Sequence, residues 1–385
     1  MTRVLVGMSG GVDSSVAATM LAQAGHDVIG VSLQLYDHSD AGRIARCCSP
    51  EDFLDARRVA SQFGFPYYVV NQEEVFSRNV LDYFVDEYRR GRTPNPCVRC
   101  NGDVKFEALG RLAVDLGATQ VATGHYARLD SCPTTGRRRL LRALDAGKDQ
   151  SYFLFDLTQE QLSLALFPLG ELTKEDVRRE AEHLGLATAG KPESQDVCFV
   201  EGGDYREFLR RRSERDRVLE QDGDIVDSAG RVLGAHHGLS GFTVGQRRGL
   251  GVSASRRLYV VSVEADTRRV VLGDESELSA AALTLTGVTW LGSDAPGAPF
   301  ETLARVRYRH AGVRCLVVPA AGGTARLTLL EPQRGISPGQ AAVFYDGDVV
   351  LGGGWIDQVE RSGVTPAARL SAGKAEGPRD GVNAT

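Results

Sequence analysis

Short apolar runs alternate with segments of helical periodicity over the first third of the chain. The apolar runs, which are typical of buried strands, cover residues 3–7, 27–35, 67–70 and 120–126. The segments with helical spacing cover residues 14–24, 49–64, 73–90 and 105–116. Parallel strands must be joined by long crossovers, which helices of this length would supply. The pattern predicts an α/β fold with a doubly wound parallel sheet.

A different pattern begins after about residue 130. Two further helices are predicted to begin with capping boxes, at Thr158 with Gln161 and at Thr173 with Asp176. Runs that alternate apolar with polar residues follow, at 258–263, 268–272, 303–318, 325–330 and 341–350. Short strands at this spacing indicate a small barrel or sandwich. We expect an α/β domain at 1–205, a small central domain at 206–280, a C-terminal β-barrel-like domain at 281–358 and a disordered tail at 359–385.

The composition is that of an ordinary soluble protein. The 385 residues include 45 Lys plus Arg and 50 Asp plus Glu, a net charge of −5, with 42% hydrophobic residues. These values exclude collagen-like, disulfide-scaffold and wholly disordered chains. The sequence has neither an apolar run of the roughly 18 residues that a membrane span needs nor a signal-peptide pattern, so we expect a cytoplasmic protein. An acidic balance disfavours a nucleic-acid partner only if the charge is evenly spread.

A glycine- and serine-rich loop separates the first predicted strand from the first predicted helix. It reads Gly7-Met8-Ser9-Gly10-Gly11-Val12-Asp13-Ser14. Glycines let the backbone approach a ligand, and a helix N-terminus offers unpaired N–H groups to an anion, so we expect phosphate binding. The loop matches neither Walker A nor the dinucleotide fingerprint, but it resembles the PP-loop of the ATP pyrophosphatases. Asp13 is either a Mg²⁺ contact or a partner of the helix dipole.

Several cysteines lie in polar loops. Cys97 and Cys100 form a C-x-x-C after two prolines, and Cys198 lies in a second polar loop. A zinc site would need four ligands, and the adjacent pair Cys47 and Cys48 is poorly spaced to complete one. A structural disulfide is disfavoured in the cytoplasm. Thiolates that perform sulfur or redox chemistry fit better, because a nearby arginine or helix N-terminus would lower a thiol pKa.

These motifs together resemble one family, the bacterial tRNA-specific 2-thiouridylases. The resemblance runs from residue 3 to about residue 356, and only the tail lies outside it. Beyond the PP-loop it rests on Cys47-Cys48-Ser49-x-Glu51-Asp52, Thr93-Pro94-Asn95-Pro96, Gly124-His125-Tyr126-Ala127, Lys148-Asp149-Gln150-Ser151-Tyr152, Ser194-Gln195-Asp196-x-Cys198-Phe199 and Gly245-Gln246-Arg247. The fold that it implies is a PP-loop ATP pyrophosphatase, or adenine nucleotide alpha hydrolase-like, domain followed by the central and β-barrel-like domains.

The resemblance also implies roles for single residues. Residues 7–14 would hold the ATP phosphates, and Leu33 and Gly124 would contact the nucleotide through their backbone. Cys198 would carry a persulfide sulfur, and Cys100 would be the second catalytic cysteine, able to form a transient disulfide with it. The residues implied around the target base are Asn95, Pro96 and Cys97. Those implied to touch the tRNA are His125, Lys148, Asp149, Gln150, Arg307, Tyr308 and Gln340.

The chemistry implied is 2-thiolation of the wobble uridine, position 34, in tRNAs for Lys, Glu and Gln. ATP would adenylate uracil O2 with release of pyrophosphate, while Mg²⁺ and donors of the loop offset the developing charge. The persulfide sulfur would then attack C2 and displace AMP. Such an enzyme is a tRNA-uridine 2-sulfurtransferase, whose partners are tRNA and a persulfide donor such as a cysteine desulfurase or a sulfur-relay protein.

One position departs from the family pattern. Some family members carry an aspartate with a general acid or base role where this chain has Cys97, and a thiol does not inherit that role. Cys97, Cys100 and Cys198 would also suffice to hold an Fe–S cluster with an open position for sulfur. The persulfide mechanism is the preferred interpretation, and the cluster is the alternative.

Arginine clusters support an RNA partner locally. They are Arg137-Arg138-Arg139 with Arg142, Arg210-Arg211-Arg212, and Arg247-Arg248. On the predicted strand at 303–318, Arg305, Arg307 and Arg309 would share one face, a pattern suited to phosphate contacts. A solvated helix or strand surface is the better explanation of any single cluster, above all of Arg210-Arg211-Arg212 beside Glu207 and Glu214.

Two other functions remain compatible with the PP-loop. A PP-loop amide ligase, in which an amine attacks the adenylate, would leave Cys100 and Cys198 without a role. A metal-binding RNA adaptor that retains the loop only as a scaffold would release no pyrophosphate from ATP and unmodified tRNA.

Overall fold

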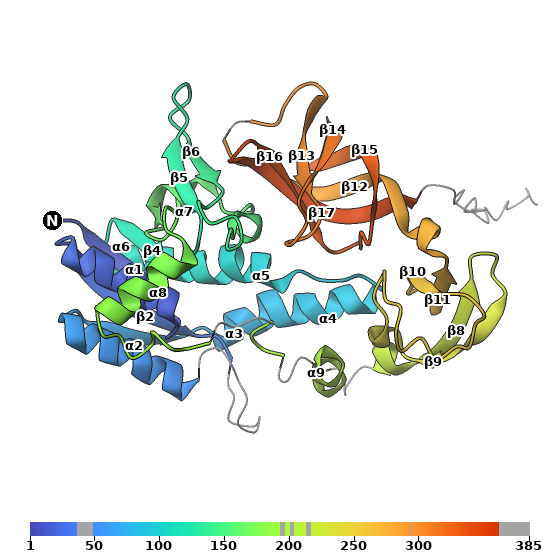
Figure 1. Ribbon diagram of the computed structural model, residues 1–385, viewed down its shortest axis with the longest axis horizontal. Coiled ribbons are helices and arrows are strands. Elements are labelled where there is room, and N and C mark those ends of the chain that lie inside the picture. Colours follow the sequence, from blue (N-terminus) through green and yellow to red (C-terminus); the bar gives the residue numbers. More distant parts are fainter. Residues whose placement is uncertain (37–48, 193–196, 201–203, 213–216, 293, 362–385) are drawn as a thin grey trace, which may run out of the picture.

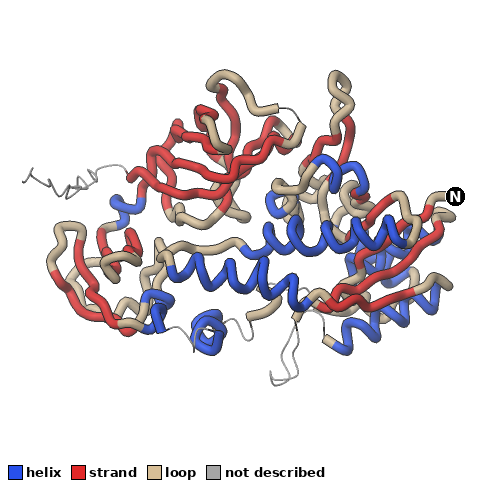
Figure 2. Tube along the Cα trace, turned by 180° about the vertical axis from the view of Figure 1, so that it is seen from behind, coloured by secondary structure: helices blue, strands red, loops and turns tan. Residues whose placement is uncertain are grey.

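The computed structural model describes residues 1–36, 49–192, 197–200, 204–212, 217–292 and 294–361. Figure 1 shows a parallel sheet flanked by helices at the N-terminal end, a β-barrel and a smaller sheet. Helices α4 (Asp82–Arg89) and α5 (Pro96–Arg99) run between these three parts, as both views show (Figures 1 and 2). Among the described residues, no helix has both the length and the apolar character of a membrane span.

The N-terminal sheet is parallel throughout. Its strands, from edge to edge, are β3 (Tyr67–Asn71), β2 (Asp27–Gln34), β1 (Arg3–Gly7), β4 (Gln120–Thr123) and β7 (Ala165–Leu166). The central strands are buried on both faces, which explains why they read as continuous apolar runs. Val4 and Val6 of β1 belong to one hydrophobic core, and Leu5 between them belongs to another. The predicted doubly wound sheet is confirmed.

Helices cover both faces of this sheet. One face carries α1 (Val12–Gln23), which packs against α2 (Pro50–Phe63) and α8 (Lys174–His183). The other carries α6 (Glu107–Asp115), which packs against β1 and β4. The capping boxes predicted at Thr158 and Thr173 are present, and they begin α7 (Gln159–Leu164) and α8.

Three predicted elements of this domain differ in detail. The helix expected at 73–90 consists of α3 (Glu73–Phe76), a π-helical turn at Ser77–Leu81, and α4. The strand expected at 120–126 ends at Thr123, because Gly124 turns away to lie against the first turn of α1. Helix α6 is preceded by a π-helical turn, Cys100–Phe106, so helical structure begins well before residue 105.

The C-terminal domain is a closed six-stranded barrel. Its strands, in order around the barrel, are β12 (Ser279–Trp290), β15 (Thr324–Arg334), β14 (Val313–Ala320), β13 (Phe300–Arg305), β16 (Ala341–Asp346) and β17 (Val349–Arg361), and β17 pairs with β12 to close it. The hairpin of β5 (Arg128–Ser131) and β6 (Arg138–Leu141) extends the barrel sheet, because β6 pairs with β17. The predicted C-terminal barrel is confirmed. Strand β17 runs to Arg361, and the rest of the expected disordered tail lies outside the described residues.

The long strand predicted at 303–318 is wrong. Strand β13 ends at Arg305 and β14 begins at Val313, with a turn between them. The shared face proposed for Arg305, Arg307 and Arg309 therefore does not exist. Arg305 points inward, because its NH1 binds the buried carboxylate of Asp149 at 2.7 Å, whereas Arg307 and Arg309 are exposed in the turn.

The central domain is built on a four-stranded sheet in the order β10 (Tyr259–Glu264), β11 (Arg269–Gly273), β8 (Asp222–Asp227) and β9 (Val232–His237). The strands predicted at 258–263 and 268–272 are β10 and β11. Strands β8 and β9 were not expected, because β8 has only two apolar residues and the two on β9, Val232 and Leu233, are exposed. Helix α9 (Tyr205–Arg212) precedes this sheet.

Candidate active site

The glycine-rich loop lies where β1 ends and α1 begins, as predicted. Gly11 occupies the N-cap position and makes no side-chain capping bond, so the first N–H groups of α1 are not satisfied by a cap. The loop is braced from within, because Ser14 Oγ accepts from the N–H of Ser9 at 3.0 Å. The arrangement presents backbone donors and the positive end of a helix dipole at the carboxyl edge of the sheet, which suits an anion.

Helix α2 and Lys191 hold the loop from outside. Gly10 has φ +72, and a Cβ there would lie 2.3 Å from the carbonyl oxygen of Asp52, so only glycine fits. Lys191 Nζ donates to the Gly10 carbonyl at 3.1 Å and to Asp52 and Asp55 at 2.6 and 2.9 Å. Lys191 did not emerge from the sequence, since it lies 181 residues from Gly10 in a segment without a motif.

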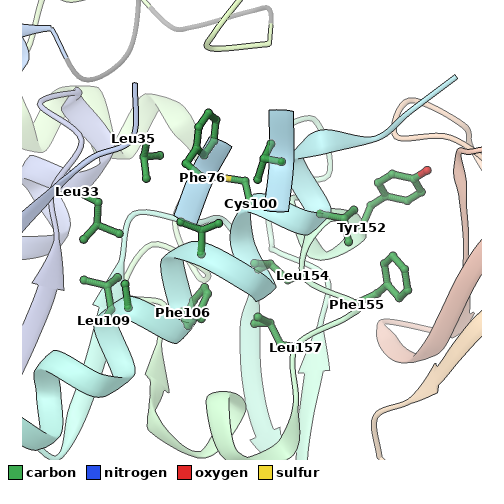
Figure 3. Close-up of a cluster of buried hydrophobic side chains, with 14 of the residues drawn as sticks. Leu33, Leu35, Phe76, Cys100, Phe106, Leu109, Tyr152, Leu154, Phe155 and Leu157 are labelled. Carbon is green, nitrogen blue, oxygen red and sulfur yellow. The ribbon is translucent and has the colours of Figure 1, made fainter. Parts of the chain in front are cut away.

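The two residues predicted to contact the nucleotide through their backbone border the loop. A Cβ on Gly124 would lie 2.7 Å from the backbone nitrogen of Ser14, so the turn after β4 packs directly on the start of α1. Leu33 is buried at the carboxyl end of β2, in the core shown in Figure 3. Strands β1, β2 and β4 thus bring residues 7–14, Leu33 and Gly124 to one edge of the sheet.

Asp13 is engaged by two side chains to which the sequence analysis assigns no role. Its Oδ1 accepts from Lys174 Nζ at 2.7 Å and from the Tyr126 hydroxyl at 2.8 Å. Lys174 opens helix α8, and its side chain is only 10% exposed. A buried cation beside a phosphate-type loop contributes positive charge where an anion would bind.

Cys97 and Cys100 flank the junction between α5 and the π-helical turn. Pro96 fills the first helical position of α5, which favours a helix start, and Asn95 before it is buried. Cys97 is exposed, whereas Cys100 is 6% exposed. Figure 3 shows the Cys100 sulfur directed at Phe76, with Leu33 and Leu35 on the far side of the same core. Cys100 therefore lies in the core that reaches the carboxyl end of β2.

Cys198 packs against the same core as Cys100. It is half-buried, and the next residue, Phe199, is 2% exposed. The Phe199 ring makes edge contacts with Phe76 and Phe84, at centroid distances of 5.8 and 5.2 Å. Phe199 thus anchors the second predicted thiol to the helices beside the first. The preceding motif residues 194–196, and Cys47 and Cys48, lie outside the described residues.

The described residues do not form a metal-binding cluster. No three His, Cys, Asp or Glu side chains among them are grouped closely enough to hold a metal ion, and Cys97, Cys100 and Cys198 all belong to this part of the chain. The three thiols therefore do not constitute a ready ligand set for an Fe–S cluster.

The predicted tRNA contacts between residues 125 and 150 differ in exposure. His125 shares a hydrogen bond with Thr123 at 2.8 Å, and burial, helped by Lys105, lowers the pKa of its imidazole to about 3. Asp149 is 3% exposed, and its carboxylate accepts from two backbone N–H groups and from Arg305. Gln150 accepts from the N–H of Tyr126. In this structure Asp149 and Gln150 bind within the protein, and Lys148 adjoins them.

The predicted contacts from the barrel lie near the base-site segment. The Tyr308 ring packs against the Phe153 ring in a tilted arrangement with centroids 4.3 Å apart, and Arg307 is exposed. Gln340 donates to the carbonyls of Thr93 and Pro94 at 3.1 and 3.0 Å, so it contacts the loop that carries Asn95 and Pro96. Tertiary folding has brought these segments, about 245 residues apart in sequence, together.

The arginine clusters are largely paired. Arg210 and Arg211 bind Glu207, each at 2.8 Å, and Arg139 binds Asp130. Arg212 binds Asp82 of α4. These pairs fit the interpretation of a solvated surface better than that of a dedicated phosphate site.

Known families match the chain in three consecutive parts. Residues 2–202 match the family described as the tRNA methyl transferase HUP domain. Residues 208–274 match the tRNA methyl transferase PRC-barrel domain, and residues 280–356 match the aminomethyltransferase beta-barrel domain.

Similar proteins match over nearly their whole length. A tRNA-specific 2-thiouridylase MnmA from Geobacter metallireducens is 52% identical over 94% of this chain and 98% of its own. Relatives of the same name from Geotalea uraniireducens and a Synechococcus strain are 49% and 48% identical, covering 92% and 94% of this chain and 95% and 99% of their own. With this identity over this extent, the chain belongs to the tRNA-specific 2-thiouridylase family.

Proposed function

We propose that this protein is an ATP-dependent tRNA-uridine 2-sulfurtransferase, which converts the wobble uridine of tRNAs for Lys, Glu and Gln to 2-thiouridine. The observation that carries the proposal is the joint position of the phosphate-type loop and the two thiols. The loop follows β1, and Cys100 and Cys198 pack on the core that includes Leu33 at the end of the neighbouring strand β2. An adenylating site and a sulfur nucleophile would then serve one base.

In the first step, uracil O2 attacks the α-phosphorus of ATP, and the P–O bond to pyrophosphate breaks. The N-terminus of α1 and residues 7–14 bind the departing phosphates through backbone N–H groups. Lys174 adds a positive charge at 2.7 Å from Asp13, next to this loop. Asp13 is the carboxylate of the loop that would hold Mg²⁺, and that ion would offset phosphate charge.

In the second step, the terminal sulfur of a Cys198 persulfide attacks C2, and AMP leaves with the former O2. The Cys100 thiolate then attacks Cys198 Sγ, a Cys100–Cys198 disulfide forms, and the sulfur stays on the base. An external thiol reductant returns both cysteines to the reduced state. Asn95, Pro96 and Cys97 adjoin Cys100 in the chain and would line the pocket for the base, and Cys97 is exposed. A separate persulfide donor would reload Cys198.

The test is a reconstitution with ATP, Mg²⁺, unmodified tRNA and a persulfide source, in which pyrophosphate and 2-thiouridine are measured separately. The wild type should form both products. Cys198→Ser and Cys100→Ser should retain pyrophosphate release and lose thiolation, whereas Cys315→Ser, a buried barrel thiol, should leave both unchanged. Thiolation by Cys198→Ser would contradict the role of Cys198 as the sulfur carrier, and a wild type that releases pyrophosphate without forming 2-thiouridine would favour the amide ligase. A wild type that releases no pyrophosphate would favour the RNA adaptor.

A further inference from the structure

The segment that leads to the catalytic cysteines is bound by the barrel. Arg92 precedes it, and its Nε donates to Glu87 of α4 at 2.8 Å while NH1 donates to Asp357 of β17 at 2.7 Å. Glu87 is 5% exposed whereas the Asp357 side chain is 33% exposed, so the bridge is shielded from water mainly on its Glu87 side. An arginine whose guanidinium binds one carboxylate on each of two elements restrains the distance and orientation of those elements.

A barrel loop also pairs with the backbone of this segment. The Thr93 N–H donates to the Pro338 carbonyl at 2.8 Å, and Gln340 donates to the carbonyls of Thr93 and Pro94. Gly339 has φ +89, and a Cβ there would lie 2.7 Å from the Thr93 carbonyl oxygen. The loop therefore approaches residues 93–94 as closely as a backbone can.

The same strand of the barrel contacts the far end of α5. The Arg99 guanidinium lies over the Trp355 ring, 4.8 Å from its centroid, and 5.5 Å from that of Tyr83. Trp355 is 7% exposed and belongs to the core that contains Cys100, although it is part of β17. A contact between a cation and the face of a buried aromatic ring holds the helix by both charge and shape.

We propose that strand β17 positions the Cys97–Cys100 helix, with Asp357 and Trp355 as positioning residues that act through Arg92 and Arg99. This inference rests on the proposed function and deepens it, because it assigns the barrel a role in building the thiol site. Helix α5 is the first turn of a helical stretch that continues through Cys100–Phe106 into α6, so the barrel anchors the end of that stretch that carries the two cysteines. Two prolines precede Cys97 and stiffen the approach, so the anchors at Arg92 and Arg99 fix where Cys100 lies.

The test compares Asp357→Ala and Trp355→Ala with a matched control in the full-length protein. Asp348→Ala removes another ion pair between the barrel and the α/β domain, with Arg128 at 2.6 Å, remote from α5. Iodoacetamide labelling of Cys100, followed by peptide mass spectrometry without tRNA, measures how often the helix opens. We expect both β17 variants to speed this labelling about tenfold, because buried groups react through local opening. Asp348→Ala should match the wild type.

A second readout separates positioning from general destabilisation. In the reconstituted reaction, Asp357→Ala and Trp355→Ala should lower kcat for thiolation while KM for tRNA and pyrophosphate release stay near the wild-type values. Trp355→Phe, which keeps an aromatic face for Arg99, should restore both kcat and slow labelling. Equal labelling of Cys100 in the β17 variants and in Asp348→Ala would overturn the inference, as would no rescue by phenylalanine. If the wild type labels slowly but forms no 2-thiouridine, the proposed function fails and the positioning role stands.

Discussion

Lys174 Nζ and Asp13 Oδ1 are joined at 2.7 Å although the two residues lie 161 positions apart. Lys174 stands in the first turn of α8, and Asp13 stands in the first turn of α1. The ion pair links helices α1 and α8, which lie on the same face of the sheet, next to the phosphate-type loop. It also places Lys174 Nζ beside the loop that is expected to bind the pyrophosphate.

Replacing Lys174 should impair the first chemical step. Lys174→Met keeps most of the buried side-chain volume but removes the charge, so the leaving pyrophosphate loses one stabilising partner. We expect pyrophosphate release to fall at least about tenfold, in the range of lost charge-stabilising donors in enzymes. Arg179→Met, on the exposed side of the same helix, is the control. Equal pyrophosphate rates in the two variants would show that Lys174 serves only the fold.

Gly124 should not tolerate alanine. The new Cβ would meet the Ser14 nitrogen at 2.7 Å and the Asp13 carbonyl carbon at 2.8 Å, and neither backbone atom can move without shifting the start of α1. We expect Gly124→Ala to lower the free energy of unfolding by about 1–3 kcal/mol, the usual cost of overpacking. It should also weaken ATP binding, measured by calorimetry. Gly190→Ala, with open space around its Cβ, should change neither quantity.

Strands β1, β2, β3 and β4 of the parallel sheet could be predicted because each is an apolar run between periodic helical segments, whereas the two-residue strand β7 is too short to give such a pattern. The turn at 306–312 could not be predicted from the sequence. The alternation of apolar and polar residues continues from Leu303 through Arg309, as it would in one unbroken strand. In the structure the Arg305 side chain holds this turn, because its guanidinium donates to the carbonyls of Tyr308 and His310, and it also pairs with the buried carboxylate of Asp149.

The candidate active site could likewise be predicted only in part. The PP-loop is contiguous, so its residues and its place after β1 were readable from the sequence. The roles of three other residues, Lys174, Lys191 and Trp355, could not be predicted. A lysine near a helix start or in a loop is usually solvated, and a tryptophan in a β region usually belongs to the core of the barrel. Only the packing of α8 on α1, and of β17 on α5, reveals where they act.

Phe199 should matter for sulfur transfer more than for adenylation. Its ring contacts Phe76, Phe84 and Phe208 and so holds the neighbouring Cys198 against the core. We expect Phe199→Ala to cost about 3–5 kcal/mol of stability, as for other buried aromatic truncations. At a temperature where the variant stays folded, thiolation should fall much more than pyrophosphate release. Phe344→Ala empties a fully buried site in the barrel and is the control for stability alone. If both variants slow the two steps in the same proportion, Phe199 has no particular role at Cys198.

His125 should make the folded state sensitive to mild acid. Burial and, secondarily, Lys105 lower its pKa from 6.5 to about 3, so the folded protein keeps the imidazole neutral where the unfolded chain protonates it. The unfolded state therefore binds more protons between these two pKa values, and the free energy of unfolding falls as pH drops from about 6.5 toward 3.

His125→Gln removes this titration while keeping a polar side chain beside Thr123. We expect the decline in unfolding free energy between pH 6 and pH 4.5 to become shallower by up to about 1.4 kcal/mol per pH unit, the limit for one proton. Urea denaturation at a series of pH values measures how the free energy of unfolding changes with pH. Subtracting the wild-type values from those of the variant removes the contribution of the carboxylates, which titrate in both proteins. His183→Gln, at the exposed end of α8, should leave the slope as it is. Parallel curves for the wild type and His125→Gln would mean that the imidazole reaches solvent and titrates normally, and the turn after β4 would then be open rather than packed.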